Sequence, residues 1–276
     1  MFLQYENIKL NFENFSDFDR KKKTILFLHG FTGSANDWKD IAKVLDKRFN
    51  KIAVDLIGHG KTSSPNDINF YMIDSIIDQI EKIIQHLGLK EVILCGYSMG
   101  GRIALNFAVN KPNLLTGLIL ESTSAGIRNK NERDKRKYND EELASYIENN
   151  PIKDFITRWL DQEIFGTLSR FSNEKIKIIK EEKMKNSRTG LANSLRGFGI
   201  GVMPYLGSEL IKLKIPTILI SGGLDDKFTQ INKSFRKLFP SANHKIISTS
   251  GHNTHLEEPK KFVELVNDFL KRFRVD

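Results

Sequence analysis

Short apolar runs recur along the chain and alternate with segments in which apolar residues are three or four positions apart. The runs are rich in Ile, Val and Leu, as expected of strands that are buried on both faces of a sheet. We expect six such strands, at 24–30, 51–56, 91–96, 116–122, 217–222 and 244–249. Because strands and helices alternate, the pattern predicts an α/β fold with a mostly parallel central sheet flanked by helices.

Two segments have the apolar spacing of amphipathic helices, which bury one face. The first covers 75–89, and Gly88 marks its end, because glycine often follows the last helical residue. The second covers 260–273. The apolar positions that share a face are Ile76, Ile77, Ile80, Ile83, Ile84 and Leu87 in the first, and Phe262, Val263, Leu265, Val266, Phe269 and Leu270 in the second.

The alternation of strands and helices stops between about residues 124 and 203. This segment is polar, charged and helix-prone, yet it contains aromatic residues at Tyr138, Tyr146, Phe155, Trp159, Phe165 and Phe171. Flexible linkers contain few aromatic residues, so we expect a helical cap insertion over 124–203. Residues 1–123 and 204–276 then form an α/β core, and the whole chain forms a single domain.

The charge of the chain narrows the choice of ligand. The net charge is +9, but Lys and Arg are scattered among Asp and Glu, and no nucleic-acid-binding module is recognisable. The exception is 128–137, which has six basic and two acidic residues. We therefore expect a small anionic ligand and no nucleic acid, although most cations of such a run are simply solvated.

The cellular compartment and the need for cofactors can be predicted from features that the sequence lacks. No stretch reaches the roughly 18 uninterrupted apolar residues of a membrane span. The first residues, 1–12, lack the basic and apolar regions of a signal peptide. Cys95 is the only cysteine, which excludes intrachain disulfides and argues against a cysteine-based metal site. We expect a cytoplasmic protein without metal, cofactor or membrane attachment, and the sequence names no protein partner.

A serine stands among glycines between a predicted strand and a predicted helix. The pentapeptide 96–100, Gly-Tyr-Ser-Met-Gly, matches G-x-S-x-G, the nucleophile elbow. Side chains two positions before and after the serine would clash in such a tight turn, which explains both glycines. The turn exposes the Oγ of Ser98 at the start of a helix, where partial positive charge favours a developing anion. Ser98 is therefore the candidate catalytic hydroxyl.

A catalytic serine of this kind needs an imidazole base and an orienting carboxylate, which follow it in the order serine, acid, histidine. We favour His252 over His255 as the base, because His252 directly follows the last predicted strand. The acid should follow the preceding strand, where Asp225 and Asp226 are equally well placed.

The loop after the first strong strand is the expected position of half an oxyanion hole. We expect the backbone N–H groups of Phe31 and Met99 to be its donors. His29 and His59 lie in the loops after the first two predicted strands, and both are more typical of histidines that bond the loop backbone.

At this point the chain resembles the α/β-hydrolase superfamily over nearly its whole length, and within it the branch of 2-succinyl-6-hydroxy-2,4-cyclohexadiene-1-carboxylate synthases of menaquinone biosynthesis. The resemblance is carried by LHGFTGSANDW (28–38), GYSMGGRIAL (96–105), LANSLRGFGIGVMP (191–204), GLDDKF (223–228) and GHNTHLEEP (251–259). The acid of this family is the first Asp of the fourth motif, which favours Asp225. The chain departs at Ile57, where the branch commonly has proline.

The resemblance implies a lyase. Enzymes of this branch act on 2-succinyl-5-enolpyruvyl-6-hydroxy-3-cyclohexene-1-carboxylate, from which a proton α to the succinyl ketone is removed and pyruvate leaves. Ser98, activated by His252 and Asp225, would be the base. The amides of Phe31 and Met99 would meet the negative charge on the ketone oxygen. The resemblance implies no metal or cofactor.

A poly-carboxylate substrate of this kind needs cations. Arg102 follows Ser98 by four residues, about one helical turn, and a guanidinium can hold a carboxylate in a bidentate pair. By similarity to the branch, Arg136 is the best candidate within 128–137, and Lys183 is a weaker one. The aromatic residues expected at the pocket are Tyr97, Trp159 and Phe165. A surface arginine at 102 and a plain core role for Trp159 are the alternatives.

Two other functions remain open. A carboxylesterase or C–C bond hydrolase would use the same triad for acyl transfer, but a neutral ester site would not need Arg102 behind the serine. A non-catalytic binding protein on this fold would not need every catalytic position to hold a competent residue.

Overall fold

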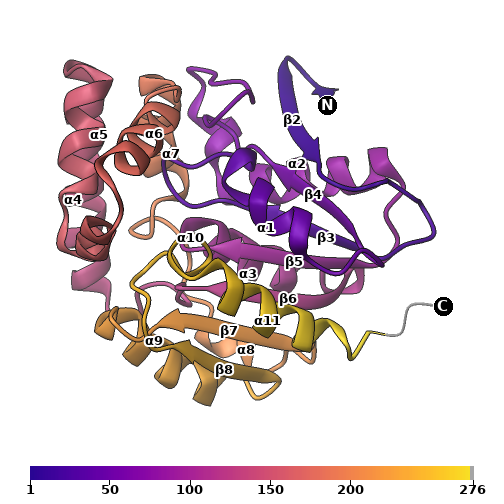
Figure 1. Cartoon of the computed structure of the whole chain (residues 1–276). Helices are drawn as coiled ribbons and strands as arrows, with labels where there is room; N and C mark the ends of the chain where they lie inside the picture. The colour runs from indigo at the N-terminus through magenta and orange to yellow at the C-terminus, as the bar shows by residue number, and fades with distance from the viewer. Residues whose placement is uncertain (274–276) are drawn as a thin grey trace.

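The computed structural model describes residues 1–273, in which helices cover an eight-stranded sheet (Figure 1). The strands are β1 Phe2–Tyr5, β2 Ile8–Asn14, β3 Thr24–Leu28, β4 Asn50–Val54, β5 Val92–Tyr97, β6 Leu115–Glu121, β7 Thr217–Gly222 and β8 Ala242–Ile247. Their order in the sheet is β1-β2-β4-β3-β5-β6-β7-β8. The strands from β4 to β8 in this order run parallel, whereas β1 and β2 are antiparallel. The predicted α/β fold with a mostly parallel sheet is therefore confirmed.

All six predicted strands are present, together with two that the sequence pattern did not predict. The missed strands, β1 and β2, form an N-terminal hairpin in which Tyr5 pairs with Ile8. Glu6, in the turn, has a φ of 51°. β1 is short and its side chains alternate between exposed and half-buried positions, so it has no buried apolar run. Edge strands of this kind lack the continuous hydrophobic pattern that marks the inner strands.

Helices cover both faces of the sheet. The core helices are η1 Ala35–Trp38, α1 Lys39–Val44, η2 Ile68–Tyr71, α2 Ile73–Leu87, α3 Met99–Asn110, η3 Pro112–Leu114, α8 Gly207–Leu210, α9 Asp226–Leu238, α10 Thr254–Glu257 and α11 Pro259–Leu270. Leu26 and Leu28 of β3 pack with α2 and α3 in one apolar cluster, and the alternate residues Ile25 and Phe27 pack with α1 and α11 in another. The predicted amphipathic helix α2 ends at Gly88, whose φ of 67° is left-handed.

Five helices lie between β6 and the core helix α8. These are α4 Lys130–Asn149, α5 Ile152–Leu160, η4 Glu163–Arg170, α6 Asn173–Lys183 and α7 Arg188–Phe198, which we call the cap. Figure 1 shows them grouped on one side of the molecule. The cap has its own apolar cluster, built around Phe155, Ile156 and Leu191.

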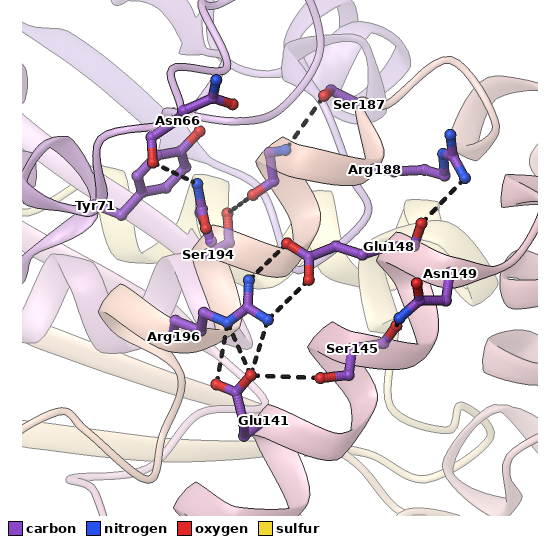
Figure 2. A network of polar contacts seen from close by, with 12 residues as sticks. Asn66, Tyr71, Glu141, Ser145, Glu148, Asn149, Ser187, Arg188, Ser194 and Arg196 are labelled. Carbon is purple, nitrogen blue, oxygen red and sulfur yellow. Dashed lines mark hydrogen bonds and ion pairs between the residues drawn. The ribbon is translucent and has the colours of Figure 1, made fainter.

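Helix α7 is fixed both to α4 and to the core. Arg196 of α7 donates to Glu141 and Glu148 of α4, with Nη2–Oε1 and Nη1–Oε1 distances of 2.8 and 2.7 Å (Figure 2). On the core side, Asn193 donates to the carbonyl of Pro65 at 3.3 Å. A Cβ on Gly190 would overlap the carbonyl oxygen of Gly58, so the α7 backbone approaches the core loop closely. These contacts set the position of the cap relative to the sheet.

Candidate active site

Ser98 lies at the junction of β5 and α3 in a strained backbone conformation, with φ 51° and ψ −107°. The two glycines of the elbow are required by packing. A Cβ on Gly96 would lie 2.5 Å from the carbonyl oxygen of Gly100, and one on Gly100 would overlap the carbonyl oxygen of Leu28. Conformations of this kind persist only where the surrounding structure enforces them, and they are common at active sites.

Ser98, His252 and Asp225 form a hydrogen-bonded chain. The Nε2 of His252 lies 3.1 Å from the Oγ of Ser98, and its Nδ1 lies 2.7 Å from the Oδ2 of Asp225. The other oxygen of Asp225 accepts the N–H of Phe228 at 3.1 Å, at the start of α9. Because both carboxylate oxygens are bonded, Asp225 holds the imidazole ring in one orientation. This is the geometry of a serine activated by a histidine and an acid.

The neighbouring candidates lie elsewhere. Asp226 is the first residue of α9 and is exposed. His255 is buried against Glu121, with its Nδ1 2.6 Å from the Oε2 of that residue. The structure therefore brings Asp225 and His252 to the serine and leaves Asp226 and His255 away from it.

The loop after β3 lies beside the elbow. A Cβ on Gly30 would stand 2.7 Å from the ring of Tyr97 and 3.7 Å from the Cβ of Ser98. Phe31 is the next residue in this loop, and Met99 is the first residue of α3. Among residues 1–273, neither backbone N–H donates to an acceptor, so both are available to a negative oxygen near Ser98.

Aromatic side chains surround the serine and the histidine. Phe31 packs against Trp159 of α5 with ring centroids 5.1 Å apart, and Trp159 packs against Phe165 at 5.7 Å. On His252, the rings of Phe165 and Phe228 lie at 6.2 and 4.5 Å. The Nε1 of Trp159 is buried and has no partner among the described residues, which leaves one donor among these apolar walls.

Tyr97 lies behind the catalytic chain. Its ring centroid is 5.4 Å from that of His252, and the residue is only 7% exposed. Burial raises the pKa of its hydroxyl, so the side chain stays neutral. Tyr97 therefore supports the imidazole ring from the apolar cluster below the site.

Two arginines lie close together near the start of α3. Arg102 is one turn after the serine, with its N–H bonded to the Ser98 carbonyl at 3.1 Å. The Nε of Arg102 is buried and has no partner in the described part of the chain. Burial and the charge of Arg136 lower the pKa of Arg102 to about 10. Arg136 reaches this position from α4, where Asp140 accepts its Nε–H at 2.8 Å. Asp140 pairs with Arg136 and its charge acts on Arg102 in the opposite direction, so Arg102 is the member of this group that is suited to an added anion.

The sequence model described as the alpha/beta hydrolase fold matches residues 23–259. This chain belongs to the α/β-hydrolase family. A protein from Bacillus subtilis (strain 168), provisionally named 2-succinyl-6-hydroxy-2,4-cyclohexadiene-1-carboxylate synthase, is 36% identical over 249 residues, which is 90% of each chain. A Serratia proteamaculans (strain 568) protein with the same name is 29% identical, over 89% of this chain and 92% of that one.

Comparison with solved structures supports the same family assignment. The structure of MenH from S. aureus superposes with a TM-score of 0.89 at 31% identity, over 95% of this chain and 97% of that chain. A thermophilic esterase from Thermogutta terrifontis superposes with a TM-score of 0.83 at 23% identity, which shows a shared fold. This α/β-hydrolase therefore belongs to the branch of the 2-succinyl-6-hydroxy-2,4-cyclohexadiene-1-carboxylate synthases.

Two other histidines of this α/β-hydrolase, His29 and His59, are bonded to loops. The Nδ1 of His29 lies 2.8 Å from the carbonyl oxygen of Gly30, and its Nε2 accepts the N–H of Leu56 at 3.1 Å. His59 bonds the carbonyl of Ile57 at 3.2 Å. Burial lowers the pKa of both imidazoles, which keeps them neutral.

Lys183 lies at the end of α6 and is half-buried. Its charge is a further cause of the lowered pKa of His29 and His59, so it lies on the side of the site formed by the loops after β3 and β4. Asn186 ties this part of the cap to the core, because its Nδ2 donates to the carbonyl of Thr32 at 2.9 Å.

Glu121, a fully buried carboxylate at the end of β6, was not predicted as a site residue from the sequence. Its one signal was a charged residue at the end of an otherwise apolar strand.

Within residues 1–273, no cluster of three His, Cys, Asp or Glu side chains could hold a metal ion. No helix in the same range combines the length and apolarity that crossing a membrane requires.

Proposed function

We propose that this α/β-hydrolase is a carbon–oxygen lyase of menaquinone biosynthesis. It eliminates pyruvate from 2-succinyl-5-enolpyruvyl-6-hydroxy-3-cyclohexene-1-carboxylate and yields 2-succinyl-6-hydroxy-2,4-cyclohexadiene-1-carboxylate. The observation that carries the proposal is a serine bonded to an imidazole–carboxylate pair, with an arginine one helical turn away whose buried Nε has no partner among the described residues. The names of the relatives support the same reaction.

The proton transfer follows from the bonded chain. The Oγ of Ser98 takes the proton from the ring carbon α to the succinyl ketone, while its own proton passes to the Nε2 of His252, 3.1 Å away. Asp225 stabilises the imidazolium that forms. The electron pair of the broken C–H bond moves toward the ketone oxygen, and the amides of Phe31 and Met99 stabilise this enolate.

Elimination then completes the reaction without water. The enolate collapses to the ketone, the ring double bond shifts, and the C–O bond to the enolpyruvyl group breaks. The leaving oxygen receives the proton held by His252 and Ser98, and the released enol tautomerises to pyruvate. The aromatic walls built from Phe31, Trp159 and Phe165 exclude water, which strengthens the electrostatic contacts at the enolate.

The cations select an acidic substrate. We propose that a substrate carboxylate binds between Arg102 and Arg136 and bonds the Nε of Arg102, which the protein leaves unpaired. Lys183, on the side of the loops after β3 and β4, is the candidate for a second carboxylate. The buried Nε1–H of Trp159 can donate to a further substrate oxygen.

A cytoplasmic location fits a chain whose only cysteine, Cys95, is buried and free.

The test supplies purified protein with the enolpyruvyl substrate and follows pyruvate with a coupled dehydrogenase, beside a panel of nitrophenyl esters. We expect pyruvate release and the cyclohexadiene product in equal amounts. The same hydrogen-bonded serine would also serve acyl transfer, as in an esterase. Rapid ester hydrolysis without pyruvate release would therefore replace the proposal with a carboxylesterase function.

A further inference from the structure

A second imidazole–carboxylate pair lies beside the candidate active site. The Nδ1 of His255 is 2.6 Å from the Oε2 of Glu121, and both side chains are almost fully buried. The other oxygen of Glu121 accepts the hydroxyl of Thr254 at 2.7 Å and the N–H of His255 at 3.0 Å. The proposed reaction uses none of these groups, yet burying a carboxylate is costly unless its bonds are all made.

Glu121 also bonds the elbow. It is the last residue of β6, and its backbone carbonyl accepts the N–H of Ser98 at 2.8 Å. One residue therefore contacts the backbone of the serine with its carbonyl and the segment that follows His252 with its carboxylate. Ser98 and His252 are 154 positions apart in the chain, so a direct tie between their segments restricts their separation.

Aromatic rings hold the same segment from the other sides. The ring of Trp38 stacks on His255 with centroids 4.2 Å apart. The ring centroid of Tyr97 lies 5.1 Å from that of His255 and 5.4 Å from that of His252, so Tyr97 packs near both imidazoles. The bonds of Glu121 to Thr254 and His255 and the stacking of Trp38 on His255 therefore restrain the segment that follows His252.

We propose that Glu121 is a positioning residue, which holds His252 within hydrogen-bond reach of Ser98 through its bonds to Thr254 and His255. This inference rests on the proposed function, in which Ser98 and His252 transfer the proton. Asp225 orients the imidazole ring, whereas Glu121 fixes the backbone from which the ring projects. Misplacement of a catalytic group by about 1 Å can lower a rate by about 100-fold.

The reactivity of Ser98 tests this positioning without the lyase substrate. A fluorophosphonate probe labels an activated serine, and the second-order labelling rate is measured for the whole chain and its variants. We expect Glu121→Gln and His255→Gln to lower this rate by roughly 10- to 100-fold, with one label still bound per chain at completion. The matched control is His244→Gln, because His244 also bonds another strand through one ring nitrogen, at Ser221, but lies on β8. Its labelling rate should stay within about twofold of the wild type.

Two variants of Thr254 separate positioning from general stability. Thr254→Val removes the hydroxyl that Glu121 accepts and should lower the labelling rate, whereas Thr254→Ser keeps the hydroxyl and should restore it. In the pyruvate assay, the same loss should fall on kcat with little change in KM. If Glu121→Gln fails to fold, His255→Gln and Thr254→Val decide the question.

Wild-type labelling rates in folded Glu121→Gln and His255→Gln would overturn the proposal. So would a smaller labelled fraction that reacts at the wild-type rate, since it would show that these residues only stabilise the fold. If the variants show the expected lower labelling rates but the wild-type protein releases no pyruvate, Glu121 would still be supported as a positioning residue. Only the lyase function would then be rejected.

Discussion

Arg102 on the core helix α3 and Arg136 on the cap helix α4 lie close enough for their charges to interact. Burial and this neighbouring charge lower the pKa of Arg102 to about 10. The Nε of this half-buried arginine is buried and has no partner among residues 1–273, which costs stability, and a bound carboxylate would offset that cost. Under the proposed function, an anion bound at this pair would link the core helix to the cap helix.

Replacing Arg102 separates binding from stability. We expect Arg102→Gln to lower kcat/KM for the enolpyruvyl substrate by about 10- to 100-fold, mostly through KM, since one charge-assisted contact contributes about 1.5–3 kcal/mol. The urea midpoint should stay equal or rise, because the variant removes a half-buried charge whose Nε is buried without a partner among the described residues. Arg102→Lys keeps the charge but loses the bidentate fork, so its kcat/KM should lie between those of the wild type and Arg102→Gln. A destabilised variant with an unchanged KM would contradict the assignment.

Arg196 should control the position of α4, and with it that of Arg136. It makes five hydrogen bonds to Glu141 and Glu148, across the contact shown in Figure 2. These bonds raise the pKa of Arg196, with the bond to Glu148 the largest cause. Because the carboxylates are partly exposed, we expect Arg196→Met to cost only about 1 kcal/mol of global stability.

The local effect of Arg196→Met should be larger. Hydrogen–deuterium exchange of the segment 130–149 should speed up, while that of 73–87 in α2 stays unchanged, and KM should rise more than kcat falls. Asp134→Asn is the matched control, because Asp134 pairs with Lys130 on the exposed side of the same helix. Unchanged exchange in 130–149 would mean that apolar packing alone holds α4.

The inner strands could be predicted because both of their faces are buried. The strands β3, β4, β5 and β7 are uninterrupted runs of buried residues, and β6 has a single half-buried position. The hairpin β1–β2 could not be recognised in the same way, because half of the β1 residues are exposed. Its position was fixed by pairing of β2 with β4, a contact between distant segments that local pattern does not show.

The site was predictable to the extent that backbone geometry restricts residue type. The two elbow glycines are required by close approaches to neighbouring carbonyl groups, so they marked Ser98 in the sequence. Local pattern could not choose between Asp225 and Asp226, since the choice depends on which side chain faces His252. The role of Glu121 was hidden because its partners are more than 130 positions away.

Stability should fall on mild acidification because of two buried histidines. Burial lowers the pKa of His29 and His59 in the folded state, whereas both titrate near 6.5 when unfolded. Below pH 6.5 the unfolded chain therefore binds protons that the folded chain does not, and the free energy of unfolding falls. The limiting slope is about 1.4 kcal/mol per pH unit for each histidine.

Urea unfolding between pH 5 and 7.5 measures this dependence. His59→Gln should reduce the slope, because it removes one of the two groups. His86→Gln, at an exposed position of α2, should leave the slope unchanged. A slope in His59→Gln equal to that of the wild type would show that His59 does not contribute.

The elbow should not tolerate a single added methyl group. Gly100→Ala places a Cβ against the carbonyl oxygen of Leu28, so α3 must shift relative to β3. We expect a loss of about 1–3 kcal/mol in unfolding free energy and a large drop in kcat. Gly166→Ala in η4 is the control, because a Cβ there meets nothing within 4 Å. Equal stability and activity of the two variants would contradict the packing argument.

The base assignment has the sharpest test. Wild-type protein and Ser98→Ala are each incubated with the enolpyruvyl substrate, and pyruvate release is followed under the same conditions. Because the Oγ that bonds His252 is the proposed base, we predict that Ser98→Ala lowers kcat by about 100- to 10,000-fold while its fold is unchanged. A folded Ser98→Ala protein that releases pyruvate at close to the wild-type rate would contradict the account.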